Sequence, residues 1–288
     1  MQLDPKLLTL PDFTVEEIQR CLDVTEPGMF ETGLIVDANN VMYRLAFAAS
    51  KDCNDANDML AVFVDKIKSV VKDINADVAV CCIDSGVSLR RAMLGAAKKP
   101  DKTPEQQAVV DMARDALRIL REVSMDDDHL DWLNACWRDG YEADDLCAAW
   151  AVSGHFVHSV LYSTDSDLYQ VTNGSGIVQL SPATGSFVKS EVPPALVPGV
   201  KALMGDTSDN VVGVKGVGPV TALKIMTGAS YINLEKETER RVRNNLALTA
   251  LPLPGSYRIL EGAPLTRVPM FTEEQATGDL DVEESLPF

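Results

Sequence analysis

The sequence predicts an α/β fold with a mostly parallel central sheet flanked by helices. Three apolar, β-branched runs have the length of buried strands, and each reaches an aspartate: GLIVDANN at Asp37, DVAVCCIDSG at Asp84, and HSVLYSTDSD at Asp165 and Asp167. Residues 56–74, between the first two runs, carry apolar side chains at helical spacing. The order strand, helix, strand favours parallel strands joined by right-handed crossovers. Ligands bind such sheets beyond the carboxyl ends of the strands, where these aspartates fall.

The remaining elements follow in chain order. For residues 1–30 we expect an N-terminal extension with one short helix, because Thr14 and Glu17 have the spacing of a capping box. The connection after Asp84 is long, begins basic and polar, and then predicts an amphipathic helix over 105–123. Residues 172–199 are rich in Gly, Ser and Pro and predict a hairpin around 181–187. Periodicity is lost over 251–288, which predicts a mostly disordered, acidic tail.

The composition describes a globular protein with no membrane role. Of the 288 residues, 46% are hydrophobic and 24% are charged, and no apolar run is long enough to span a bilayer. The N-terminus predicts no secretory signal, and the six cysteines are scattered without a C-x-x-C motif, so we expect a cytoplasmic protein. The net charge of -17 by itself argues against a nucleic-acid partner. Local charge matters more, since residues 88–102 are mostly basic and 271–288 are acidic.

Carboxylates reach the expected sheet edge from several separate segments. They are Asp37; Asp84; Glu142, Asp144 and Asp145; Asp165 and Asp167; and Asp206 and Asp209. Acidic side chains that gather without bases repel one another strongly unless cations neutralise them. Hard oxygen ligands without His or Cys suit Mg²⁺ or Mn²⁺ and do not suit zinc. The sequence therefore predicts a divalent-metal site.

Each acid taken alone has a simpler interpretation. Asp37 and Asp84 could cap the helices that follow their strands. The acids of GYEADDL stand at the start of a predicted helix, where negative charge favours the helix dipole, and either aspartate of STDSD fits an Asx-turn. Capping does not explain why all of these acids should meet at one edge of the sheet.

The segment GDTSDNVVGVKGVGPVTALKIM joins acids to a feature suited to phosphate. Gly216 and Gly218 precede Pro219, which is a good first-turn residue for a helix over 219–226. Glycines let the backbone approach a ligand, and the free amides of a helix start hold phosphate oxygens. Lys215 and Lys224 add positive charge. The simpler alternative is a tight turn between two helices.

Five motifs together resemble the 5' nuclease superfamily, the flap endonucleases and 5'-3' exonucleases of bacteriophages and of the N-terminal domains of bacterial DNA polymerases. The motifs are IVDANNVMYR, CCIDSG, YEADDLCAAW, STDSDLYQ and GDTSDNVVGVKGVGPVTA, in the family's order over residues 33–227. The resemblance implies a structure-specific hydrolase of phosphodiester bonds that uses two metal ions, Mg²⁺ with Mn²⁺ as a substitute. It assigns Asp37, Asp84, Glu142, Asp144 and Asp145 to the first ion. It assigns Asp165, Asp167, Asp206 and Asp209 to the second.

The resemblance also implies two further elements of the family. A helical arch at about 86–125 would pass a single-stranded 5' end, with Lys99 and Lys102 at the scissile phosphate and Arg90 or Arg91 in a similar role. Lys98, Lys102 and Ser166 depart from residues that are common in the family at these places. A helix-three-turn-helix subdomain over 201–250, a relative of the helix-hairpin-helix, would hold duplex DNA with a K⁺ ion at the hairpin. Its contacts match Lys215, Gly216, Gly218, Thr221 and Lys224.

Three smaller assignments leave their alternatives open. Tyr43 would stack on a base near the cut, with a core tyrosine as the alternative. The basic run KETERRVRNN would supply the remaining duplex contact, or is a solvated helix face. The tail DLDVEESLPF is similar to the C-terminal tip of bacterial single-strand binding proteins, which would make it a contact for a replication protein, or it is a plain terminus.

The sequence thus predicts four regions: the extension 1–30, a catalytic domain 31–200, a DNA-binding subdomain 201–250 and the tail 251–288. The expected partner is DNA with a 5' flap, nick or primer, including an RNA primer strand, and the expected state is a monomer in phage-type replication. A PIN-type ribonuclease and a non-catalytic DNA-binding replication protein are the alternatives. A phosphatase with an aspartyl nucleophile is poorly supported, because ANN follows Asp37.

Overall fold

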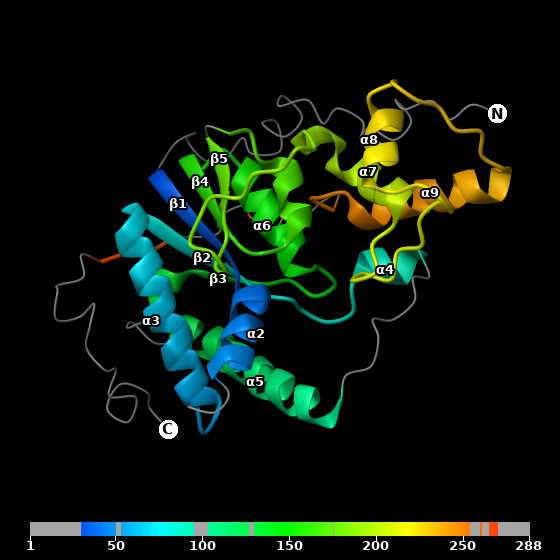
Figure 1. Cartoon of the computed structure of the whole chain (residues 1–288). Helices are drawn as coiled ribbons and strands as arrows, with labels where there is room; N and C mark the ends of the chain where they lie inside the picture. Colours follow the sequence, from blue (N-terminus) through cyan, green and yellow to red (C-terminus); the bar gives the residue numbers. More distant parts are fainter. Residues whose placement is uncertain are drawn as a thin grey trace.

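The central sheet is parallel throughout the described part of the chain. A computed structural model describes residues 30–49, 53–94, 103–126, 130–174, 176–253, 260 and 265–269. Its strands are β1 (Phe30–Asp37), β2 (Val78–Cys82), β3 (Ala135–Cys136), β4 (Phe156–Tyr162) and β5 (Ile177–Leu180), in the spatial order β3-β2-β1-β4-β5 (Figure 1). The three strands expected from the sequence form its centre, so the predicted α/β class is confirmed.

The register of the central strands brings their carboxyl ends to one edge. Val36 of β1 lies opposite Cys81 of β2 and Tyr162 of β4. The last five residues of β1 are buried, as are all of β2 and the end of β4, because helices cover both faces. Such strands read as continuous apolar runs. The chain therefore leaves all three strands at the same level, and the polar residues that follow them share one edge.

Helices form one layer on each face of the sheet. Helices α2 (Ala38–Ala49), α3 (Ala56–Ile74) and α5 (Pro104–Asp126) enclose one core with side chains such as Leu34 and Val36 (Figure 1). Helix α6 (Ala143–Val152) and the 3-10 helix η3 (Ser166–Val171) enclose the other core with Ile35. The observed α3 has the predicted bounds. Its N-cap is Asp55, whose carboxylate accepts hydrogen bonds from the first-turn amides.

Two strands, β3 and β5, were not predicted from the sequence. Strand β3 has two residues, too few for any periodicity, and β5 lies in a Gly-, Ser- and Pro-rich stretch. The hairpin expected after β5 is present as an antiparallel bridge between Leu180 and Phe187. The short elements α4 (Leu89–Leu94), η2 (Asp131–Leu133) and η4 (Pro194–Leu196) complete the connections.

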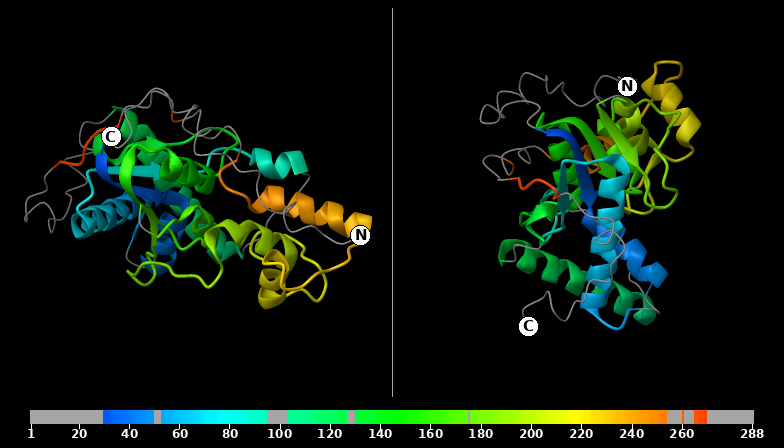
Figure 2. Two further views of the ribbon diagram at one scale, coloured as in Figure 1. Left: turned by 90° about the horizontal axis from the view of Figure 1, so that it is seen from above. Right: turned by 90° about the vertical axis from the view of Figure 1, so that its left-hand side faces the viewer.

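A third core lies beside the sheet and belongs to three helices. Helices α7 (Val197–Met204), α8 (Pro219–Met226) and α9 (Lys236–Thr249) pack through residues such as Leu203, Ile225 and Val242. Two views place this group at the end of the molecule away from α3 (Figures 1 and 2). The loop from α7 to α8 approaches α7 so closely that a Cβ on Gly213 would lie 2.2 Å from the Met204 carbonyl, so only glycine fits there.

Some residues of the region 251–288, which the sequence predicts to be a mostly disordered tail, pack against the sheet. Leu251 and Leu260 are buried in the core that α6 covers. The Val268 amide donates to the Asp77 carbonyl (2.8 Å), at the amino end of β2. Leu251 and Leu260 belong to no periodic pattern, yet both fill places in this core. The expected helix within 1–30 lies outside the described residues, as does the acidic terminus.

Within the described part of the chain, no helix combines the length and apolar character that crossing a bilayer requires.

Candidate metal centre and nucleic-acid interface

The aspartates that follow three neighbouring strands meet at the carboxyl edge of the sheet. Asp37 ends β1, Asp84 lies two residues beyond β2, and Asp165 follows β4. The negative charges of Asp84 and Asp165 both act on Asp37. The structure thus gathers these three carboxylates as the strand pattern predicts.

Two asparagines in the first turn of α2, two and three residues after Asp37, fix the neighbouring loops, and the sequence predicted no role for them. The Asn39 Oδ1 accepts a hydrogen bond from the Asp84 amide (2.8 Å). The Asn40 Oδ1 accepts bonds from the Thr164 amide (3.0 Å) and its hydroxyl (2.9 Å). Asn39 and Asn40, which follow β1, therefore hold the loops that follow the neighbouring strands β2 and β4. The signal in the sequence was the amide pair in DANN.

The two strand-end aspartates Asp37 and Asp84 both accept bonds from helix-start amides, which does not exclude metal binding. Asp37 accepts from the Asn40 amide (3.0 Å) and the Ser163 hydroxyl (2.9 Å). Asp84 accepts from the Ala143 amide (2.7 Å), so it caps α6 and not a helix next to its own strand. A carboxylate offers about four lone-pair positions. One or two capping bonds leave the others for a cation.

The first compact acidic cluster stands at the start of α6. Glu142 is the N-cap residue, and Asp144 and Asp145 are in the first turn. One ligand oxygen from each of the three lies within 4.8 Å of the others. Asp145 is 1% exposed. The charge of Asp165 also acts on Asp144, so this cluster joins the acids of the strand ends.

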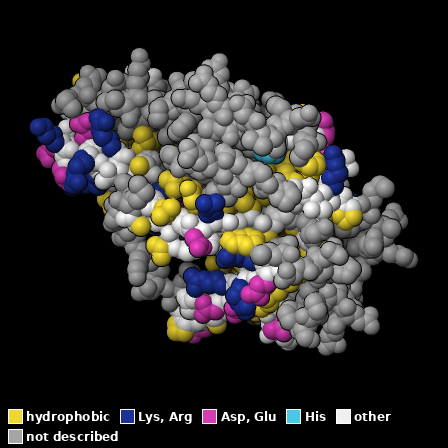
Figure 3. Space-filling model, turned by 180° about the vertical axis from the view of Figure 1, so that it is seen from behind, with side chains coloured by type: hydrophobic (Ala, Val, Ile, Leu, Met, Phe, Trp, Pro, Cys, Tyr) yellow, Lys and Arg dark blue, Asp and Glu magenta, His cyan; other side chains and the backbone are white. Residues whose placement is uncertain are grey.

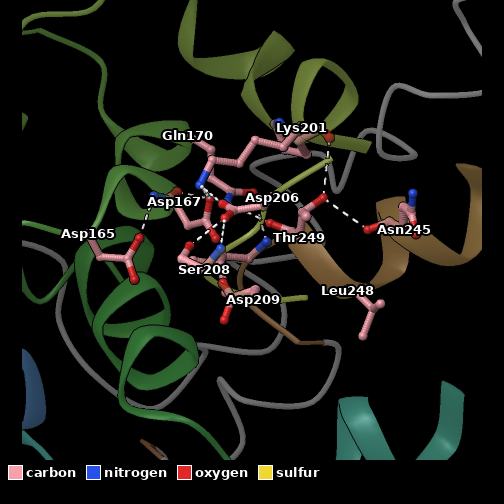
Figure 4. Close-up of polar contacts among 12 residues, drawn as sticks. Asp165, Asp167, Gln170, Lys201, Asp206, Ser208, Asp209, Asn245, Leu248 and Thr249 are labelled. Carbon is pink, nitrogen blue, oxygen red and sulfur yellow. Dashed lines mark hydrogen bonds and ion pairs between the residues drawn. The ribbon is translucent and has the colours of Figure 1, made fainter. Parts of the chain in front are cut away.

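The second compact cluster joins η3 to the loop after α7. Ligand oxygens of Asp167, Asp206 and Asp209 lie within 4.8 Å of one another, and Figure 4 shows them side by side. The loop is held by paired bonds between Asp206 and Val211, whose amides and carbonyls exchange two hydrogen bonds (2.9 and 2.7 Å). The stretch GDTSDN is therefore a tight turn that carries two acids toward the sheet.

Cationic side chains contact both clusters, contrary to the expectation of acids without bases. Lys201 of α7, which is 8% exposed, forms ion pairs with Asp167 and with Asp206 (3.0 Å) (Figure 4). Arg91 of α4 pairs with Asp209 (2.6 Å) and approaches Glu142 (3.6 Å). Lys201 is five residues from Asp206 in the sequence, but its pairing with Asp167 and the pairings of Arg91 join distant parts of the chain, so no sequence spacing indicated them. They leave a net negative charge at the centre.

Burial changes the protonation of the acids in the centre. It raises the pKa of Asp37 to about 7, and the charges of Asp84 and Asp165 act in the same direction. It also raises the pKa of Asp144 well above its usual range, with help from Asp145. Carboxylates held in this way gain stability from a nearby multivalent cation.

The second cluster is more nearly neutralised by its own lysine. Burial raises the pKa of Asp167 to about 6, although the charge of Lys201 opposes the change. Burial acts to raise the pKa of Asp206 as well, but hydrogen bonds from Ser208 and Lys201 lower it to about 2. Asp206 is thus ionised at every pH at which the protein would be used.

The donor chemistry of both clusters fits a hard divalent cation. Every ligand atom in the two compact clusters is a carboxylate oxygen, and the strand-end aspartates add more of them. Zinc prefers nitrogen and sulfur ligands, whereas Mg²⁺, Mn²⁺ and Ca²⁺ prefer oxygen. The thiol of Cys147, behind the first cluster, is fully buried, and burial raises its pKa to about 11, so it does not compete as a thiolate ligand.

The basic residues expected at the arch, and the tyrosine expected to stack on a base near the cut, divide into three kinds. Lys99 and Lys102 lie outside the described residues. Arg90 is 3% exposed, and its guanidinium pairs with Asp145 inside the protein, so it does not face solvent as a phosphate contact would require. Tyr43 is partly buried and packs against the core formed by α2, α3 and α5, which favours the core alternative.

The loop before α8 presents the features expected of a phosphate-binding turn. Gly216 has φ +81°, a conformation that favours glycine, and no atom lies near enough to meet an added Cβ at Gly216 or Gly218. Lys215 in the loop and Thr221 in the first turn are exposed at the start of α8, and Lys224 is exposed in its last turn. The first-turn amides of α8 therefore open to solvent next to Lys215, with Lys224 farther along the helix.

Two of the four basic residues in the run on α9 are paired within their own helix. Arg240 bonds Glu237 (2.7 Å) and Arg243 bonds Glu239 (2.9 Å), which favours the alternative of a solvated helix face. On the face seen in Figure 3, Lys and Arg side chains of the described residues lie beside Asp and Glu.

Comparison with known proteins gives a consistent result. The family model of the 5'-3' exonuclease N-terminal resolvase-like domain matches residues 32–192, more than half of the chain. The 5'-3' exonuclease of Mycoplasma pneumoniae is 26% identical over 219 residues, which cover 68% of this chain and 72% of that protein. That of Bacillus subtilis is 26% identical over 250 residues, 80% of this chain and 78% of its own. The thermostable DNA polymerase I of Thermus thermophilus is 29% identical over 229 residues, only 25% of that protein.

Solved structures from bacteriophage T5 share the fold. The T5 flap endonuclease in a pseudo-enzyme-product complex with DNA and metal ions has a TM-score of 0.65 and 21% identity, covering 80% of this chain and 98% of its own. A T5 protein co-crystallised with metal ions has a TM-score of 0.62 and 20% identity, covering 77% and 90%. Identity at this level establishes a common fold and nothing finer.

Proposed function

The chain belongs to the family of 5'-3' exonucleases with an N-terminal resolvase-like domain, and we propose that it is a structure-specific 5' nuclease. It would hydrolyse phosphodiester bonds near the 5' ends of flapped, nicked or primed duplex DNA, with two Mg²⁺ ions as cofactors. The observation that carries the proposal is the pair of compact acidic clusters at the carboxyl edge of the sheet, next to an exposed helix start suited to phosphate. The relatives named as 5'-3' exonucleases and the DNA-bound T5 structure support the same reading.

The clusters divide the expected ligands between two places. Glu142, Asp144 and Asp145, with Asp37 and Asp84 from the strand ends, would hold one cation. The other would be held by Asp167, Asp206 and Asp209, with Asp165 between the two places. When bound, such cations supply Lewis-acid chemistry, because they lower the pKa of water and neutralise the developing charge on the phosphodiester.

The chain's own residues would bind and orient the reacting groups. Asn39 and Asn40 keep the strand-end loops in register, which fixes where Asp84 and the loop of Asp165 stand. Lys201 holds Asp167 beside Asp206. The open amides of α8 would accept a backbone phosphate of the duplex. Because the same loop carries Asp206 and Gly216, a bound duplex would lie a fixed distance from the acids.

The decisive test is a panel of 5'-labelled substrates incubated with the protein and Mg²⁺. The panel holds a 5' flap, a nicked duplex, an RNA-primed duplex, single-stranded DNA and single-stranded RNA, and the products are sized. Cleavage of the branched or primed duplexes that stops in EDTA is the expected result. A preference for single-stranded RNA would point to a PIN-type ribonuclease. Binding of DNA without Mg²⁺-dependent cleavage would point to a replication protein without catalysis.

The remaining assignments extend this proposal. We place the catalytic domain at 31–200, with its arch at about 86–125, and the DNA-binding subdomain at 201–250 with a K⁺ ion at the hairpin, although α7 begins at Val197. Lys99 and Lys102 would contact the scissile phosphate. We further propose that the protein is monomeric and cytoplasmic, and that Mn²⁺ can substitute for Mg²⁺. The acidic terminus would bind a replication protein. The free cysteines among the described residues agree with a reducing compartment.

Replacing the lysine before α8 together with the lysine in its last turn should weaken DNA binding and reduce the dependence of binding on salt. Lys215 and Lys224 are both exposed, so Lys215→Ala/Lys224→Ala would remove two expected phosphate contacts. We expect the slope of log K against log [salt] to fall by about 1 for each lysine. Fluorescence anisotropy with a labelled duplex over a series of KCl concentrations measures this slope. Lys66→Ala on the exposed face of α3 is the matched control, and an unchanged slope in the double variant would place the duplex elsewhere.

A further inference from the structure

Arg90 connects two parts of the molecule that the proposed function must hold in register. It lies in α4, after β2 and the strand-end acid Asp84, and its side chain is 3% exposed. One guanidinium nitrogen pairs with Asp145 of the first acidic cluster. The other donates to the carbonyls of Leu248 (3.2 Å), Ala247 (3.4 Å) and Ala250 at the end of α9. A single buried cation thus bonds the acidic cluster and the helix group together.

In the first acidic cluster, Arg90 contacts one carboxylate oxygen of Asp145. Asp145 receives Arg90 on Oδ1, and the Leu253 amide donates to the same oxygen (2.6 Å). Asp145 is 1% exposed, so its orientation depends on these two partners. Both partners lie outside the helix that carries Asp145. Movement of the end of α9 would therefore be transmitted to this carboxylate.

On the side of α9, the contact holds the helix that supports the loop before α8. The Asn245 amide group donates to the carbonyls of Ala202 (3.0 Å) in α7 and Val212 (2.8 Å) in the loop. Gln170 of η3 bonds the same end of α9, because it donates to the Thr249 carbonyl (2.9 Å) and accepts from the Leu251 amide (2.7 Å). The bonds run from Asp145 through Arg90 and α9 to the loop that presents Gly216.

We propose that Arg90 is a positioning residue that sets which phosphodiester bond is cut. It would do so by fixing the distance between the acidic cluster and the helix start that holds the duplex. The planar fork of arginine reaches a carboxylate and several carbonyls at once, which the point charge of lysine does not. This inference rests on the proposed function of the same site, and it gives Arg90 a role inside the protein in place of a contact with DNA.

The test compares product lengths from one labelled 5' flap substrate. Wild-type protein is expected to give a narrow distribution of lengths. Arg90→Met should spread cleavage over neighbouring positions and lower the rate by about 100-fold, since a misplacement of about 1 Å has that effect. For Arg90→Lys we expect a spread of product lengths and a rate between those of the wild type and of Arg90→Met. The dissociation constant for plain duplex should stay within about twofold, because the α8 surface is untouched.

Product length separates positioning from simple stabilisation. A variant that is only less stable yields the same products more slowly, so an unchanged distribution for Arg90→Met overturns the inference. If Arg90→Met does not fold, Gln170→Met provides the test. Gln170 bonds the same end of α9 and does not contact Asp145, so its loss should broaden the distribution of product lengths in the same way. Arg267→Met, which removes a guanidinium paired with Asp77 at the far end of the sheet, is the control and should leave the distribution unchanged. Absence of cleavage by the wild type would instead contradict the proposed function.

Discussion

Asp37→Asn should abolish cleavage while the protein stays folded. Asp37 ends β1 between Asp84 and Asp165, is 5% exposed, and accepts hydrogen bonds from the Asn40 amide and the Ser163 hydroxyl. An amide has almost the same shape but no charge, so the centre loses a ligand at its middle. Loss of one electrostatic group from a catalytic site costs about 10²–10³ in rate, and we expect at least the upper figure here. Single-turnover cleavage of a 5' flap with Mg²⁺ measures it.

The fold should tolerate this change for a reason visible in the structure. The asparagine oxygen can accept the Asn40 amide bond that Asp37 now accepts, and the Ser163 hydroxyl can turn to accept a bond from the new amide group. Asp65→Asn, on the exposed side of α3, is the matched control and should cleave at the wild-type rate. Normal turnover by Asp37→Asn would refute the assignment of the centre. Asp145→Ala is a poorer choice, because it leaves the buried Arg90 without its carboxylate.

The parts of the fold that the sequence predicted are those with a local cause. Helix α3 repeats its apolar residues at helical spacing behind the cap Asp55, and α8 starts at Pro219, so both have the expected bounds. The three central strands are apolar throughout because both faces are covered. Strands β3 and β5 depend on a neighbouring strand for their hydrogen bonds, and their own residues carry no pattern.

The acids of the centre were predictable and their cationic partners were not. Acids that follow parallel strands must meet at one edge, so topology alone brings them together. The partners depend on how distant helices pack: Lys201 reaches Asp167 from another element, and only the fold shows that Arg90 points inward while its neighbour Arg91 reaches Asp209. Two adjacent arginines in a sequence give no sign of which one is buried.

The protein in EDTA should become less stable as the pH rises from about 4 to 8. Burial raises the pKa of Asp37 to about 7 and that of Asp167 to about 6, from a usual value of 3.8. A carboxyl whose pKa is higher in the folded state binds its proton more tightly there, so its contribution is complete below about pH 4 and is lost as pH passes the raised value. For Asp37 the change of about 3 pKa units corresponds to on the order of 4 kcal/mol. The lowered pKa of Asp206, about 2, acts only below this range.

Saturating Mg²⁺ should reverse this trend, because a cation that binds only the folded protein stabilises it and protons compete for the same carboxylates. Melting temperatures at pH 5, 6, 7 and 8, each in EDTA and in Mg²⁺, measure the effect. We expect the melting temperatures in EDTA and in Mg²⁺ to be nearly equal near pH 5 and to differ increasingly toward pH 8. Asp37→Asn should flatten the EDTA curve, since the residue that contributes most to the slope no longer titrates. A melting temperature in EDTA that is equal at pH 5 and pH 8 would mean that these carboxylates are solvated and not held apart from water by the fold.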